Sequence, residues 1–195
     1  MRRNILKTLK NILYFSLVLV LLITLTGFQS FALEEKPDVL ITSIGQSADA
    51  RMVSVLLTRH DIETAYEQLA STEIIKDYKI VIAVVGGSSK GLGAAGIDQR
   101  DEIARTKELL QEIEEQEVIL LVMHTGGEAR RGALSDAFLD EIVPYANHLI
   151  VVESGNMDGY FTDISKEKDI SIEIVAKIVD TGELVKSFIA ENLEQ

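Results

Sequence analysis

Four segments of the chain combine glycine with polar side chains: segment 1 (residues 45–51), segment 2 (86–96), segment 3 (124–132) and segment 4 (153–160). Glycine lets the backbone approach a ligand closely. Serine hydroxyls, backbone N–H groups and basic side chains can together hold a carboxylate or a phosphate. The sequence therefore predicts a small anionic ligand, bound by Gln46, Ser47, Gly87, Ser88, Ser89, Lys90, Gly91, His124, Gly126, Gly127, Glu128, Arg130, Arg131, Asn156 and Asp158.

Basic residues are scarce in this acidic chain, yet several lie in or beside these segments, namely Arg51, Lys90, Arg130 and Arg131. The guanidinium fork of arginine binds a carboxylate or phosphate through two parallel hydrogen bonds. The same geometry serves internal ion pairs, and an Arg131–Asp136 pair would clasp a loop. The sequence leaves the ligand role and the internal role open for each arginine.

A catalytic alternative uses the G-x-S-x-G pattern of residues 87–91, in which Ser89 would be the nucleophile and His124 the general base. A nucleophile elbow runs directly into a helix, whereas we expect residues 92–97 to separate Ser89 from the next helix. The sequence also places no acidic residue where it would orient His124. A small hydrolase is therefore the alternative function, and a surface scaffold that binds another protein is a third.

No cofactor is expected. Gly91, Gly93 and Gly96 match the spacing of a dinucleotide-binding loop, but they lie too far from the preceding strand, and no acidic residue ends the next one. Candidate metal ligands are His124, Glu128, Asp136, Asp158 and Asp163, but their spacing matches no zinc or calcium motif. The sequence predicts no metal site.

The N-terminus has the layout of a secretory signal. A basic start is followed by an apolar stretch at residues 12–28 and by small residues that predict cleavage after Ala32. The apolar stretch is near the minimum for a membrane-spanning helix, so an uncleaved anchor stays open, and it would be the only contact with a membrane. In either case, we expect an extracytoplasmic domain, secreted or held at the outer face of the cytoplasmic membrane. Residues 33–38 form a linker, and residues 39–195 form one domain.

The predicted signal segment and the predicted domain differ in charge. Residues 1–32 contain four basic residues and no acidic one, so the rest carries 15 of the 19 basic and all 31 acidic groups, a formal charge of −16. Such a domain repels nucleic acid, and nucleic-acid binding is excluded on this ground. The chain has no cysteine, so no disulfide stabilises it.

Strand and helix patterns alternate along the remaining chain. Continuous apolar, β-branched runs predict strands at residues 39–44, 62–66, 79–85, 118–123, 148–152 and 170–175. Helical spacing predicts helices at residues 48–58, 98–115 and 134–146, and a last one from Asp180. This order predicts an α/β fold: a doubly wound, mostly parallel sheet of five or six strands, flavodoxin-like or Rossmann-like. In such sheets, ligands bind beyond the carboxyl ends of the strands, where all four segments fall.

Three stretches of sequence carry a family resemblance: G-G-S-S-K-G-L-G-A-A-G-I-D, M-H-T-G-G-E-A-R-R-G-A-L-S-D and V-V-E-S-G-N-M-D-G-Y-F-T. They resemble an exported bacterial family known as domain of unknown function 6305, over most of the chain after Pro37. The resemblance implies an exported α/β domain with these segments as its signature. It implies no activity, substrate or catalytic residue.

Overall fold

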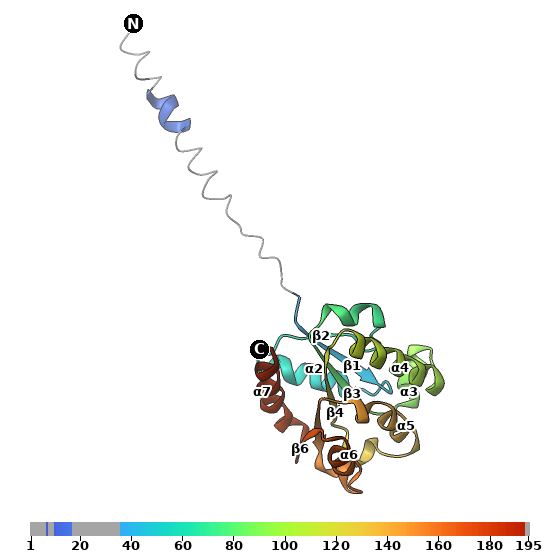
Figure 1. The fold of residues 1–195 in the computed structure, drawn as a ribbon. Helices are drawn as coiled ribbons and strands as arrows, with labels where there is room; N and C mark the ends of the chain where they lie inside the picture. Colours follow the sequence, from blue (N-terminus) through green and yellow to red (C-terminus); the bar gives the residue numbers. More distant parts are fainter. Residues whose placement is uncertain (1–6, 8–9, 17–35, 194–195) are drawn as a thin grey trace. The chain divides into compact units, whose positions relative to one another are not determined.

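The computed structural model describes residue 7, residues 10–16 and residues 36–193 (Figure 1). The chain divides into two units, Met1–Glu35 and Lys36–Gln195. Most of the predicted apolar stretch and the predicted cleavage point after Ala32 lie outside the described residues. Among the residues that are described, no helix has the length and apolar character needed to cross a membrane.

The second unit is built on a parallel sheet in the order β2-β1-β3-β4-β5-β6. Its strands are β1 (Val39–Ile44), β2 (Ala65–Tyr66), β3 (Ile80–Val85), β4 (Ile119–His124), β5 (His148–Val152) and β6 (Ser171–Val175). The predicted doubly wound α/β fold is confirmed, and β1 pairs with β3 as the flavodoxin-like order requires. The strand order reverses between β1 and β3, so this is the topological switch point.

Helices cover both faces of the sheet (Figure 1). Two of them, α2 (Asp49–Arg59) and α7 (Thr181–Leu193), pack on one face. The other face is covered by α3 (Ser89–Ala95), α4 (Gln99–Glu115), α5 (Ala133–Ile142) and α6 (Tyr160–Lys168). Short 3₁₀ helices occur at η1 (Thr72–Asp77), η2 (Gly127–Arg130), η3 (Val143–Tyr145), η4 (Glu153–Asn156) and η5 (Ile178–Asp180).

The central strands are mostly apolar because both of their faces are buried, with Thr42 and Ser43 of β1 as buried polar exceptions. Every residue of β1 and β3 is buried, and alternate side chains enter the clusters on opposite faces. Burying one such aliphatic side chain stabilises the fold by about 1.5–3 kcal/mol. Both clusters consist only of residues from Val39 onward, so the second unit has a core of its own.

Two helices were not predicted from the sequence. Segment 2 was expected to be a loop, but α3 begins within it at Ser89, immediately after the Ser88 cap. No helix was predicted between residues 146 and 180, but α6 runs from Tyr160 to Lys168. The predicted helix at residues 98–115 is α4, which Asp98 caps in a complete capping box, whereas the predicted strand at residues 62–66 is reduced to Ala65–Tyr66.

Candidate functional site

Segments 1, 2 and 3 meet at the switch point, where the parallel strands end. A β-carbon on Gly86 would lie 2.9 Å from Ser47 Oγ and 3.0 Å from Asp49 Oδ2, so segment 2 packs directly on these side chains. A β-carbon on Gly126 would lie 2.7 Å from the same Asp49 oxygen. Glycine at both positions therefore makes room for one buried carboxylate between three segments.

The Asp49 carboxylate is the centre of this junction. Asp49 is buried, and its Oδ2 accepts a hydrogen bond from Ser47 Oγ at 3.0 Å. The Arg130 Nε lies 3.3 Å from the same oxygen and forms an ion pair with it. Since Arg130 keeps 33% of its side chain exposed, it reaches from the buried carboxylate to the surface. The buried Asp49 carboxylate therefore holds the Nε side of the Arg130 guanidinium.

A second buried acid fixes the backbone of segment 1. Glu102, on α4, is fully buried and accepts hydrogen bonds from Gly45 N at 2.7 Å and from Gln46 Nε2 at 3.0 Å. Arg105, one turn further on, donates from Nε to Glu102 Oε2 and from Nη2 to Oε1, both at 2.8 Å. Gln46 needs this support because it is a non-glycine residue with a φ of 58°, in the sparsely populated left-handed region.

His124 is fully buried at the end of β4, and both of its ring nitrogens face backbone carbonyls. Nδ1 lies 3.1 Å from the Val85 oxygen, and Nε2 lies 3.2 Å from the Gly127 oxygen. Its ring stacks on Phe161, and the backbone of Gly155 covers its edge. Burial lowers the pKa of His124, while the two carbonyls act in the opposite direction. His124 therefore joins the end of β3 to segments 3 and 4, and neither nitrogen is turned towards solvent.

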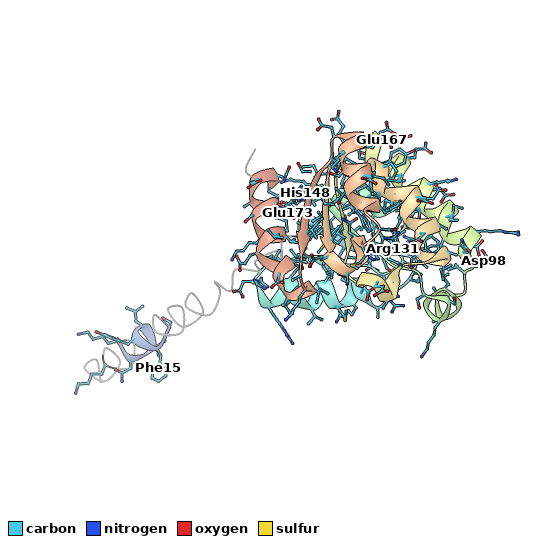
Figure 2. All side chains as sticks on the ribbon, turned by 90° about the horizontal axis from the view of Figure 1, so that it is seen from below. Phe15, Asp98, Arg131, His148, Glu167 and Glu173 are labelled. Atoms are coloured by element: carbon cyan, nitrogen blue, oxygen red, sulfur yellow. The ribbon has the colours of Figure 1, made fainter. Side chains whose placement is uncertain are left out.

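Arg131 clasps segments 3 and 4 together. Its Nε donates to Asp136 Oδ1 at 2.8 Å, and its Nη1 and Nη2 donate to the two Asp158 oxygens at 2.9 Å each. Nη1 also donates to the Gly155 carbonyl. Arg131 is labelled in Figure 2, and only 14% of its side chain is exposed. The Arg131–Asp136 clasp inferred from the sequence is present, and the Asp158 carboxylate, whose pKa is lowered by this hydrogen bonding, completes it.

Segment 2 presents its polar groups at the start of α3. Ser88 caps the helix, because its Oγ accepts a hydrogen bond from Gly91 N at 3.0 Å. Gly87 N is engaged too, since it donates to Ser135 Oγ at 2.9 Å. Ser89 and Lys90 are exposed, and no ion pair of Lys90 occurs within the described part of the chain. The turn between β3 and the next helix is therefore shorter than the sequence predicted, because α3 begins at Ser89 itself.

The other candidate residues take part mainly in the internal structure. Asn156 caps α6, because its Oδ1 accepts from Phe161 N at 2.9 Å, and its Nδ2 donates to Thr162 Oγ1. Gly127 has a φ of 60° and packs on Ser154, and Glu128 is exposed. The structure thus brings segments 1–4 together, but it leaves few of their charged groups available to a ligand.

The proposed catalytic pair is not joined. No contact between Ser89 and His124 occurs among the described residues, and the imidazole nitrogens are directed at carbonyls instead. Within the same part of the chain, no group of three or more His, Asp or Glu side chains could hold a metal ion. The geometry at this edge provides hydrogen-bond donors and exposed cations rather than a base next to a nucleophile.

Sequence reasoning missed Glu102 and Arg105 entirely. It also missed Thr125, whose hydroxyl is buried without a hydrogen-bond partner, as is Gln46 Oε1. For Glu102 and Arg105, the only local signal was an acid and an arginine on an otherwise ordinary helix. In the described part of the chain, the cavities of about 740 and 510 Å³ have no lining residue in segments 1–4, whereas the cavity of about 400 Å³ is lined in part by Ala48 and Arg51 of segment 1.

The comparisons with known proteins give one family. The sequence model of a family described as domain of unknown function (DUF6305) matches residues 36–189. No curated protein matches the chain.

Among solved structures, the chain is similar to the psychrotrophic esterase EstA from Pseudoalteromonas sp., with a TM-score of 0.32 and 9% identity over 80% of this chain and 96% of that one. It is similar to AlinE4, an SGNH-hydrolase family esterase, with a TM-score of 0.31 and 11% identity over 84% and 96% of the two chains. For a GDP-L-fucose synthetase from Naegleria fowleri bound to NADP, the TM-score is 0.35, with 12% identity over 73% and 55%. Scores this low carry no information on activity.

Proposed function

The chain belongs to the family of the domain of unknown function DUF6305, and we propose that its domain binds a small anionic molecule where the parallel strands end. The observation that carries the proposal is the arrangement of Arg130. Its Nε faces the buried Asp49 carboxylate, while its Nη1 and Nη2 groups have no partner among the described residues. A guanidinium has five N–H donors, so most of this fork is available at the surface.

Two cations are the anion-contacting groups, the half-buried Arg130 of segment 3 and the exposed Lys90 of segment 2. They follow β4 and β3, which are neighbours in the sheet. Arg131 differs, because two carboxylates and a carbonyl already use its donors. We therefore assign Arg131 to holding the site together, and we assign anion binding to Arg130 and Lys90.

The Asp49 carboxylate has two opposite effects on anion binding by Arg130. A carboxylate beside Arg130 offsets part of the positive charge that would attract an anion. The same carboxylate holds the guanidinium in one position, which reduces the side-chain entropy lost on binding. A rigid, half-neutralised arginine favours selective binding of a ligand with hydrogen-bonding oxygens over general attraction of anions. Carboxylates and phosphates are the ligand classes that fit.

Isothermal titration of residues 36–195 with inorganic phosphate, citrate and short carboxylates tests the proposal. One charge-assisted hydrogen bond contributes about 1.5–3 kcal/mol, so Arg130→Ala should weaken binding roughly 10- to 100-fold. Lys90→Ala should also weaken it. Lys76→Ala removes the same charge from η1, at the opposite edge of the sheet, and should leave binding unchanged. Binding that survives Arg130→Ala, or that Lys76→Ala weakens equally, would contradict the proposal.

We also propose that residues 1–32 export the domain. The order of a basic start, an apolar stretch and small residues supports this role. Mass spectrometry of the full chain produced in a bacterium should find extracytoplasmic protein that begins at Leu33, or intact protein in the membrane fraction if the segment is an anchor. Intact protein in the cytoplasm would contradict export.

A further inference from the structure

Helix α2 is apolar on two opposite faces. Val53 and Leu57 are fully buried against the sheet, whereas Met52 and Val55 point outward with 49% and 41% of their surface exposed. A surface helix usually has one apolar face, and a helix that is apolar all round is usually covered. The outer side of α2 thus combines the exposed apolar side chains of Met52 and Val55 with the exposed Arg51 and Arg59.

A groove runs along this outer face. It has a volume of about 400 Å³, is open on one side and is lined by eight residues from α2, its N-terminal approach and η5. Leu56 and Val179, the latter 59% exposed, complete its apolar floor with Met52 and Val55. The volume lies within the range of small-molecule sites, about 300–1,000 Å³, which are mostly apolar with a few polar groups.

The only charged residues in the lining are two arginines, Arg51 and Arg59. They are eight residues apart on α2, a rise of about 12 Å along the axis. Arg59 lies in the last helical turn, where a cation is favourable, but Arg51 lies in the first turn, where the helix dipole disfavours one. The Arg51 guanidinium also lies 5.1 Å from the centre of the Tyr66 ring, which is outside the groove. Two cations without an acid are unexpected in a domain with a formal charge of −16.

The groove fits a small molecule better than a protein. A stable interface takes about 20–30 residues from each partner, far more than the eight that line this groove. A second copy of the chain would bring two further arginines against these two, and their like charges would repel. An apolar chain with one negative end matches both the floor and the rim.

We propose that this groove is a second ligand site, which binds an amphipathic monoanion of the acyl-carboxylate type. The apolar chain lies along Met52, Val55 and Val179, and the carboxylate pairs with Arg51 or Arg59. Its lining shares Ala48 and Arg51 with segment 1 but includes neither Lys90 nor Arg130, so binding here does not depend on the anion site at the carboxyl ends of the strands.

Titration of residues 36–195 with decanoate, followed by displacement of the fluorescent anion 8-anilinonaphthalene-1-sulfonate, tests this site. Decanoate should bind saturably with one molecule per domain. Val55→Asp places a negative charge on the groove floor and should weaken binding at least about tenfold, and one of Arg51→Ala and Arg59→Ala should do the same. Met157→Asp is the matched control, because Met157 is 80% exposed outside the groove. Circular dichroism checks that each variant is folded.

Three outcomes would overturn the proposal: no saturable binding of decanoate, equal weakening by Met157→Asp and Val55→Asp, or equally tight binding of uncharged 1-decanol. Arg130→Ala separates the two proposed sites. This variant should leave the affinity for decanoate unchanged. If it abolished decanoate binding instead, the decanoate site would lie at the carboxyl ends of the strands.

Discussion

Removing the buried Glu102 carboxylate should destabilise the domain strongly. Glu102→Ala leaves the Arg105 guanidinium, whose side chain is only 14% exposed, without its acidic partner. It also leaves the Gly45 N–H and the Gln46 amide without their acceptor. Breaking a buried ion pair on one side costs about 3–5 kcal/mol, because an uncompensated charge stays buried.

That loss is a large part of the total stability of a domain, about 5–15 kcal/mol. For a domain of this size, 1 kcal/mol shifts the melting temperature by about 2–4 °C, so Glu102→Ala should lower it by roughly 6–20 °C. Urea denaturation and differential scanning calorimetry measure both quantities. Glu108→Ala removes an exposed acid from the same helix and should change the unfolding free energy by less than about 0.5 kcal/mol. A loss below about 1 kcal/mol for Glu102→Ala would refute the assignment of this ion pair as the support of segment 1.

Three further predictions concern residues at the carboxyl ends of the strands. Gly91→Ala should destabilise the fold because its β-carbon would overlap the Gln46 carbonyl, whereas Gly93→Ala meets no atom within 4 Å and should be neutral or stabilising by up to about 1 kcal/mol; equal effects in urea denaturation would contradict this contact. Because burial lowers the pKa of His124, the unfolded state takes up its proton first as the pH falls below about 6.5, so the unfolding free energy should be retained above that pH and should decrease towards the folded-state pKa. Denaturation between about pH 7.5 and pH 5.5 measures this slope, and a stability that rises on acidification would contradict the assignment. Arg131→Lys keeps the charge but loses the bidentate clasp, so it should destabilise the domain by about 1–2 kcal/mol; an unchanged melting temperature would show that the clasp is not structural.

The sequence was sufficient for the sheet because burial on both faces leaves a strong local pattern. The predicted strand at residues 39–44 matches β1 residue for residue, and the helix capped by Asp98 ends at Glu115 as predicted. These elements were predicted well because apolar runs and capping side chains act within a few residues of one another.

The helices that were missed depend on distant contacts. Glycine at positions 91 and 93 lowers helix propensity, so segment 2 was interpreted as a loop. In the structure, α3 is held by the buried Leu92 and by close packing of Gly91 on segment 1. Helix α6 is capped by Asn156, which lies outside the helix and five residues before Phe161, a longer reach than the capping patterns read from sequence.

The candidate site was predicted in position but not in its internal organisation. Glycine-rich segments after parallel strands must meet at one edge, and their contacts agree with that expectation. The sequence did not predict which of the two arginines would be fully engaged in internal ion pairs, because Arg130 and Arg131 are adjacent and chemically identical. Only the fold places Asp158 beside Arg131 and the buried Asp49 beside Arg130.

The most direct test of the central claim is a ¹H–¹⁵N spectrum of residues 36–195 during titration with inorganic phosphate and then with citrate. Binding at the carboxyl ends of the strands predicts saturable shifts that cluster in segments 2 and 3, around Lys90 and Arg130, and that are lost in Arg130→Ala. Shifts confined to α2, or no saturable shift with any anion, would contradict an anion site at this edge of the sheet.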